Sequence, residues 1–198
     1  MIKLIIFDFS GVCYTEEEEP YMGKFSHRHK IGYKSLMEFY MPLILRAQKG
    51  EFGGREVIIK VLDRFNIKDD PDKIIKDMMA VKKEKHDTLK LVKHLSHKYK
   101  IAYFTNYDED FFREFDRRFK PAQYFDYGIV SYQILSKKPE PEGFVKIMKQ
   151  FKVHPEEVVF TDDNEANLVN AKALGINTIH FKDIEYFKKE LKKLGVDE

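Results

Sequence analysis

The chain has 198 residues, of which 43% are hydrophobic and 34% charged, and its formal net charge at pH 7 is +2. This composition allows one domain with a large insertion or two small domains, and it excludes a disordered chain. The small net charge gives no reason to expect a nucleic acid or a membrane as partner. A single cysteine, Cys13, excludes an intramolecular disulfide framework, and no signal-peptide or membrane-spanning pattern is present. We therefore expect a soluble, cytoplasmic protein.

Short apolar runs along the chain predict strands. The first, Leu4-Ile5-Ile6-Phe7, has no polar alternation, which is typical of a strand buried on both faces of a parallel sheet. Amphipathic helical stretches alternate with the later runs, and this alternation predicts an α/β fold with a parallel sheet. The later strands are predicted at 101–104, 129–130, 158–160 and 178–181, and helices at 88–97, 144–151, 165–174 and 186–194.

The segment between the first strand and residue 88 departs from this alternation of strands and helices. It holds about seventy residues with helical spacing and no convincing strand, far more than an ordinary connection. We therefore expect a helical subdomain over residues 14–87, seated on the strand edge, with 1–13 and 88–198 forming the core. Two charged segments, Glu16 to Glu19 and Lys82 to Lys100, are interpreted as solvated faces.

Polar residues stand at the carboxyl ends of several predicted strands. Asp8 ends the first strand, Thr105-Asn106 follows the second, and Asp162-Asp163 follows the fourth. Right-handed crossovers bring these ends to one edge of the sheet, where ligands bind in open α/β folds. Together with Lys138, the set suits an anionic substrate held by a divalent cation, because carboxylates are ligands that Mg²⁺ prefers. An aspartate here can also be a nucleophile that forms an aspartyl-phosphate.

Four short segments contain the polar residues named above: FDFSGV at 7–12, FTN at 104–106, KPEP at 138–141 and FTDDNEAN at 160–167. In this order they resemble the motifs of the haloacid dehalogenase (HAD) superfamily, subfamily I. The helical insertion is similar to the cap of that subfamily. The resemblance implies a hydrolase with a flavodoxin-like (Rossmannoid), doubly wound parallel sheet and an inserted helical cap.

The resemblance also implies catalytic roles. Asp8 would be the nucleophile that attacks phosphorus. Thr105, in one motif with Asn106, would bind the transferring phosphoryl group, and Lys138 would neutralise charge on both the nucleophile and the phosphate. The implied reaction is hydrolysis of a small phosphorylated metabolite.

A magnesium site is implied in the same way. Asp8 and Asp163 would ligate Mg²⁺ through carboxylates, and Ser10 through its backbone carbonyl. Asp162 and Asn167 would order the site around the ion.

Ser10 departs from the family pattern. The family's phosphatases usually have an aspartate here that protonates the leaving group and activates water, a contribution of roughly 10²–10⁴-fold. Three interpretations stay open: a phosphatase that is slow or uses good leaving groups, an enzyme for a non-ester substrate such as a haloacid, and a binding or regulatory protein without turnover. The paired Asp162-Asp163 disfavours a dehalogenase, since that chemistry needs no metal.

Other residues near these motifs are interpreted as structural. Cys13 is predicted to be a small apolar filler rather than a reactive thiol. The aromatic residues Phe39, Tyr40 and Phe65 of the insertion are predicted to belong to its core.

Overall fold

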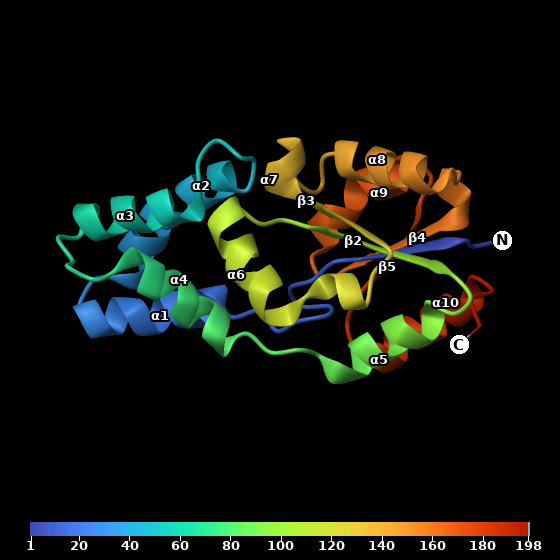
Figure 1. Cartoon of the computed structure of the whole chain (residues 1–198), viewed down its shortest axis with the longest axis horizontal. Coiled ribbons are helices and arrows are strands. Elements are labelled where there is room, and N and C mark those ends of the chain that lie inside the picture. Colours follow the sequence, from blue (N-terminus) through green and yellow to red (C-terminus); the bar gives the residue numbers. More distant parts are fainter. Residues whose placement is uncertain (198) are drawn as a thin grey trace.

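The computed structural model describes residues 1–197 and shows a single parallel sheet with helices on both faces (Figure 1). The strand order is β3-β2-β1-β4-β5, so that β1 lies at the centre between β2 and β4. The predicted α/β fold is therefore confirmed. The strands are β1 Leu4–Phe7, β2 Lys100–Thr105, β3 Tyr127–Val130, β4 Val158–Asp162 and β5 Asn177–His180.

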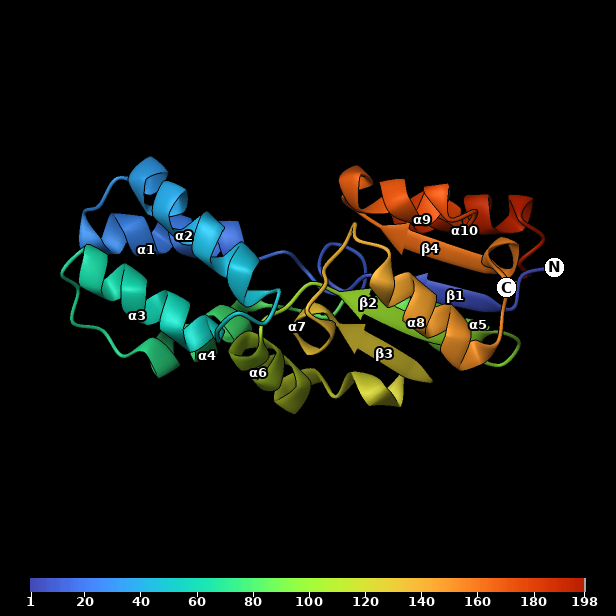
Figure 2. The same cartoon turned by 90° about the horizontal axis from the view of Figure 1, so that it is seen from above.

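The sheet separates two hydrophobic clusters, and β1 contributes to both. Ile5 and Phe7 pack on the side of α5 (His86–Leu95), α6 (Glu109–Phe119) and α10 (Ile184–Lys193). Leu4 and Ile6 pack on the side of α8 (Glu142–Phe151) and α9 (Val169–Ala173). Figure 2 shows the second group of helices against the strands. All four β1 side chains are fully buried, which explains the uninterrupted apolar run.

The structure differs from the predicted elements at two places, α6 and the segment 165–174. No helix was predicted between the second and third strands, where the structure has α6. The short helix α7 (Ser131–Ile134) follows β3. The signal is present, because Phe111, Phe115 and Phe119 recur at helical spacing and all are buried. The predicted helix at 165–174 is divided into a 3₁₀ segment, Glu165–Leu168, and α9.

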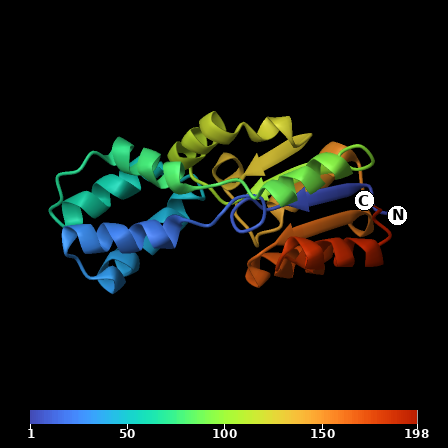
Figure 3. The ribbon, with the colours of Figure 1, turned by 90° about the horizontal axis from the view of Figure 1, so that it is seen from below.

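Four further helices lie together beyond the carboxyl edge of the sheet, at one end of an elongated molecule (Figure 3). They pack on one another through α1–α2, α2–α3 and α3–α4 contacts, and α3 and α4 also contact α6. None of the helices in the described part of the chain is long and apolar enough to span a membrane. The four are α1 Glu18–His29, α2 Tyr33–Ala47, α3 Gly54–Arg64 and α4 Pro71–Val81.

Two connections join these helices to the sheet, and they run beside each other. Thr15 N–H donates to the carbonyl of Lys83 at 2.9 Å, and Lys85 N–H donates to the carbonyl of Cys13 at 2.8 Å. Tyr14 and Glu84 form an isolated antiparallel bridge between the same segments. The pairing fixes which residues of the returning segment face the sheet edge.

Candidate active site

A pocket of about 350 Å³ lies between the carboxyl edge of the sheet and the helices α1, α2 and α4. Its floor comes from the ends of β1, β2 and β4, as expected for an open parallel sheet. The structure brings all the predicted catalytic and metal-binding side chains to this one pocket. They are Asp8, Ser10, Thr105, Asn106, Lys138 and Asp163.

An ammonium group between two carboxylates forms the centre of the site. Lys138 Nζ lies 2.6 Å from Asp8 Oδ1 and 2.6 Å from Asp162 Oδ2. Lys138 is 2% exposed and Asp162 is fully buried, so each charge needs the other to be tolerated there. Burial lowers the pKa of Lys138, but Asp162 and Asp8 outweigh burial and hold the pKa above its ordinary value. Lys138 is therefore a cation in this triad.

Asp8 is a carboxyl group removed from water yet open to the pocket. Burial, with a smaller contribution from Asp162, raises its pKa to about 7, against the lowering effect of Lys138. The Lys138 ammonium thus favours the ionised form of Asp8. A desolvated carboxylate whose charge is held by a neighbouring ammonium is suited to nucleophilic attack.

Asp162 has both oxygens occupied by donors from the protein. Oδ1 accepts from Asn164 N–H at 2.9 Å and from Asn167 Nδ2 at 3.0 Å. Oδ2 accepts from Asn167 Nδ2 at 3.1 Å as well as from Lys138. The residue is therefore placed to orient Lys138 and the loop after β4.

Asp163, in contrast, directs its carboxylate toward the loop after β1. A Cβ built on Gly11 would lie 1.8 Å from Asp163 Oδ2, so only glycine allows this approach. Gly11 also has φ of 76°, which favours glycine. Oxygens of Asp8, Asp162 and Asp163 all lie within 4.8 Å of one another. This is a compact set of hard oxygen donors of the kind that binds a divalent cation.

The end of β2 supplies two polar side chains with different surroundings. Thr105 is 1% exposed at the floor of the pocket. Asn106 accepts a hydrogen bond from Lys138 N–H at 2.9 Å and donates to the carbonyl of Lys138 at 3.3 Å. The amide of Asn106 therefore holds the backbone that carries Lys138, whereas Thr105 lies at the floor of the pocket.

Ser10 has a partner that the sequence did not reveal. Lys82 Nζ donates to Ser10 Oγ at 3.0 Å and to the carbonyl of Thr15 at 2.6 Å, and the residue is 3% exposed. Burial lowers the pKa of Lys82, but Tyr107 and Glu16 outweigh it and the pKa stays above the ordinary value.

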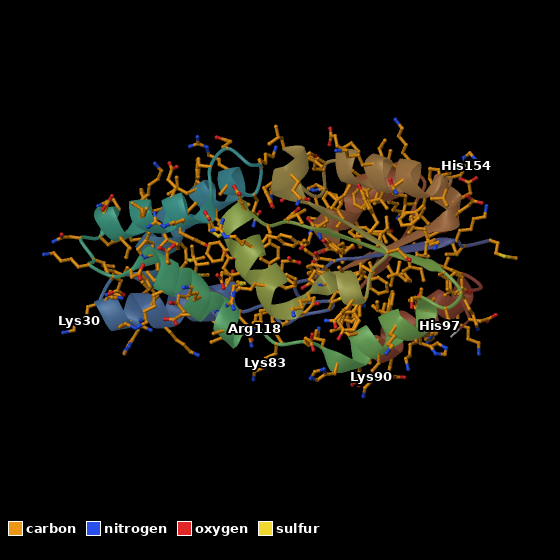
Figure 4. The ribbon with its side chains drawn as sticks, in the orientation of Figure 1. Lys30, Lys83, Lys90, His97, Arg118 and His154 are labelled. Atoms are coloured by element: carbon orange, nitrogen blue, oxygen red, sulfur yellow. The ribbon has the colours of Figure 1, made fainter. Side chains whose placement is uncertain are left out.

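The interpretation of Lys82 to Lys100 as a solvated face is therefore wrong at its first residue. Lys83 and Lys90 do point outward (Figure 4). Lys82 points inward because the bridge between Tyr14 and Glu84 sets the register of the returning segment.

The acidic run Glu16 to Glu19 is also only partly solvated. Glu18 lines the pocket, and its Oε1 atom is buried without a hydrogen-bond partner among residues 1–197. Burial raises the pKa of Glu18 to about 7, against a lowering effect of the Tyr40 phenol. Tyr40 is buried as predicted, but it lines the pocket too. Cys13 is fully buried, and burial raises its pKa, in agreement with an unreactive filler.

The comparison with known proteins fits this geometry. The family model described as haloacid dehalogenase-like hydrolase matches residues 51–181, more than half of the chain. The chain belongs to this family. The predicted HAD membership is thereby confirmed, and with it the prediction of a hydrolase. The matched segment begins after Asp8 and Ser10, so the roles of these two residues rest on the geometry above.

Individual relatives of this HAD protein include phosphatases. The phosphorylated carbohydrates phosphatase of Thermotoga maritima is 25% identical over 187 residues, which cover 90% of this chain and 84% of that protein. Bifunctional epoxide hydrolase 2 of Rattus norvegicus is 38% identical over 73 residues, but the match spans only 13% of that longer protein. A magnesium complex of a HAD family enzyme from Bacteroides thetaiotaomicron superposes with a TM-score of 0.78 at 25% identity, covering 91% of this chain and 93% of that one.

Proposed function

We propose that this HAD hydrolase is a Mg²⁺-dependent phosphatase that acts on a small phosphorylated metabolite through an aspartyl-phosphate on Asp8. The observation that carries the proposal is the position of Asp8, open to the pocket at the end of β1 and 2.6 Å from the buried Lys138 ammonium. The similarity to the carbohydrate-phosphate phosphatase of Thermotoga maritima supports the same reaction class.

The chain's own residues can bind and transfer a phosphoryl group. The hydroxyl of Thr105 and the ammonium of Lys138 face the space beside Asp8, where a phosphate dianion would receive a hydrogen bond and a compensating charge. Asp8 attacks phosphorus, and water then cleaves the acyl phosphate and restores the carboxylate. Asn106 and Asp162 hold Lys138 in place during both steps.

The donor set fits a magnesium ion. Asp162 has both oxygens engaged, which leaves Asp8 and Asp163, with the backbone carbonyl of Ser10, to hold the cation. Magnesium commonly uses one or two carboxylates and keeps other positions for water and phosphate oxygens. A bound Mg²⁺ would neutralise phosphate charge and orient the phosphoryl group.

We propose that residues 14–87 act as a cap over a core formed by 1–13 and 88–198. The cap supplies Glu18, Tyr40 and Met78 to the pocket, while the core supplies the polar floor. A volume of about 350 Å³ suits a small metabolite. Glu18 Oε1, which has no donor within the described chain, can accept a hydrogen bond from a substrate hydroxyl. The favoured substrates are therefore hydroxylated phosphate esters.

The test is release of inorganic phosphate from a panel of sugar and polyol phosphates, with and without Mg²⁺. We expect Mg²⁺-dependent turnover in the wild type and none in Asp8→Asn. Asp87→Asn, a carboxylate exposed on α5, serves as the matched control and keeps full activity. Borohydride reduction during turnover should convert the acyl phosphate and mark residue 8 in a peptide mass map.

Two results would contradict the proposal. Full activity in Asp8→Asn would exclude Asp8 as nucleophile. Binding of inorganic phosphate by a wild type that hydrolyses no member of the panel would show a binding protein rather than an enzyme.

A further inference from the structure

Lys82 is a buried cation that has no role in the reaction proposed above. It comes from the segment that returns from α4, yet it reaches the pocket beside Asp8 and Ser10. Within residues 1–197, no carboxylate lies within 4.0 Å of its ammonium, which donates to the Ser10 hydroxyl and the Thr15 carbonyl. The Tyr107 phenol lies beside it, and Glu16 supports its charge from a greater distance. The ammonium is held by neutral oxygens rather than by a carboxylate in contact, so its charge acts directly on the Ser10 hydroxyl.

Three groups surround this ammonium: the Ser10 hydroxyl, the Tyr107 phenol and the Thr15 carbonyl. Their arrangement allows the Ser10 hydroxyl to donate a hydrogen bond into the pocket. Lys82 donates to Ser10 Oγ, so an oxygen lone pair of Ser10 is occupied and its own O–H can donate, either to the Tyr107 phenol beside it or to a group in the pocket. The phenol of Tyr107, 8% exposed, lies within hydrogen-bonding reach of both Ser10 and Lys82. The carbonyl of Thr15 fixes the ammonium from the other side. A positive charge is thus held directly behind the Ser10 hydroxyl.

We propose that Ser10, oriented and polarised by Lys82, stabilises the oxygen of the leaving group during phosphoryl transfer. This inference rests on the phosphatase function proposed above. Ser10 is the catalytic residue that touches the departing oxygen, and Lys82 is a positioning residue that acts through it. The pair stabilises developing negative charge where the family's usual aspartate would instead supply a proton.

The step balances without a general acid. An oxygen of Asp8 forms a bond to phosphorus, and the bond from phosphorus to the leaving oxygen breaks. The departing oxygen keeps the electron pair, and its charge is held by the Ser10 O–H and the ammonium behind it. It then takes a proton from water. The hydroxide so formed is equivalent to the nucleophile that cleaves the acyl phosphate, which yields inorganic phosphate and the free carboxylate.

This role predicts a dependence on the leaving group. Stabilisation of the departing oxygen matters most when the alcohol is a poor leaving group and little when it is 4-nitrophenol. We therefore expect Ser10→Ala and Lys82→Met each to lower kcat for alkyl phosphates by about 10²-fold, the usual cost of removing one such donor. For 4-nitrophenyl phosphate the loss should be below about threefold, because little charge needs stabilisation.

The experiment measures kcat over a series of phosphate monoesters, from 4-nitrophenyl to alkyl, for wild type, Ser10→Ala, Lys82→Met and the double variant. Because the two residues act as one unit, the double variant should lose no more than either single variant. Lys85→Met is the matched control: Lys85 comes from the same returning segment, but it donates to the carbonyl of Gly11 and not to Ser10. Any loss in Lys85→Met should be equal for every leaving group.

Equal losses over the whole series in Ser10→Ala and Lys82→Met would overturn the inference, since a structural defect does not discriminate between alcohols. Additive losses in the double variant would also overturn it. If Lys82→Met does not fold, Ser10→Ala carries the same test, because it removes only a hydroxyl. A wild type that hydrolyses no ester would instead refute the phosphatase function, and the present inference with it.

Discussion

Asp108 Oδ1 accepts a hydrogen bond from the backbone N–H of Gly54 at 2.8 Å. The same oxygen accepts from Asp110 N–H at 3.0 Å and Phe111 N–H at 3.2 Å, at the start of α6. One carboxylate oxygen therefore serves the first turns of two helices, α3 and α6. A Cβ on Gly54 would lie 2.2 Å from this oxygen, which explains the glycine. Asp108 thus joins the start of α3 to the start of α6.

Removing this carboxylate should destabilise the protein. We expect Asp108→Ala to lower the free energy of unfolding by about 2 kcal/mol, because a helix N-cap is lost and buried N–H donors are left unpaired. Asp108→Asn keeps an oxygen acceptor and should lose less. Urea unfolding followed by circular dichroism measures both. Equal stability of wild type and Asp108→Ala would show that the shared contact contributes nothing.

The metal site makes a separate prediction. Asp163→Asn should abolish detectable Mg²⁺ binding in calorimetric titration, because the variant loses one of the two carboxylates proposed as ligands. Asn167→Ala should bind Mg²⁺ only about tenfold more weakly, because Asn167 does not ligate the ion in this proposal but orients the Asp162 carboxylate. The opposite order of effects would mean that Asp162, rather than Asp163, carries the metal.

Glu18 makes stability depend on pH. Burial raises its pKa from the ordinary 4.5 to about 7 in the folded protein, so the folded state keeps a proton that the unfolded state loses. Its contribution is present below pH 4.5 and lost as the pH rises to about 7, at about 1.4 kcal/mol for each pKa unit.

Glu18→Gln should therefore reduce the fall in unfolding free energy between pH 4.5 and 7 by at least about 1 kcal/mol. Denaturant melts at several pH values provide the measurement. Part of the fall should persist, because burial also raises the pKa of Asp108 to about 6. An unchanged pH profile in Glu18→Gln would show that Glu18 is ionised in the folded protein.

Lys82 should also determine whether an aspartate at position 10, the usual residue of the family's phosphatases, can act as a general acid. In the wild type the Lys82 ammonium lies 3.0 Å from Ser10 Oγ. In Ser10→Asp the new carboxyl would therefore lie beside this ammonium, which would lower the pKa of the carboxyl. An ionised aspartate cannot protonate a leaving group, and the Ser10 O–H is lost as well, so Ser10→Asp alone should not raise kcat for alkyl phosphates above the wild type. Ser10→Asp combined with Lys82→Met should gain more than about tenfold over Ser10→Asp. A large gain in Ser10→Asp alone would contradict the charge effect.

The sequence was sufficient for the sheet and for the floor of the pocket. Both depend on local signals: apolar runs that end in polar residues, and short motifs in a fixed order. Asp8, Thr105 and Asp163 converge because parallel strands end at one edge.

The sequence was not sufficient for the side of the pocket formed by residues between β1 and α5. Lys82 and Lys83 are adjacent and chemically identical, yet one is buried and the other exposed. Only the pairing of Tyr14 with Glu84, seventy residues apart in the chain, decides between them. Asp108 is similar, since its contact with Gly54 joins segments whose proximity no local pattern indicates.

The central place of β1 also governs how the chain assembles. Leu4 pairs with Lys100 on one side and with Val158 on the other, so the first strand to be synthesised acquires its second neighbour only near the end of synthesis. Until then a fully apolar strand has an open edge, which exposes a nascent chain to aggregation. Pairing over such long separations also slows folding. The ion pairs of Lys138 depend on the same order of synthesis. Asp162 is made after Asp8 and Lys138, so a growing chain has no complete site before β4 is made.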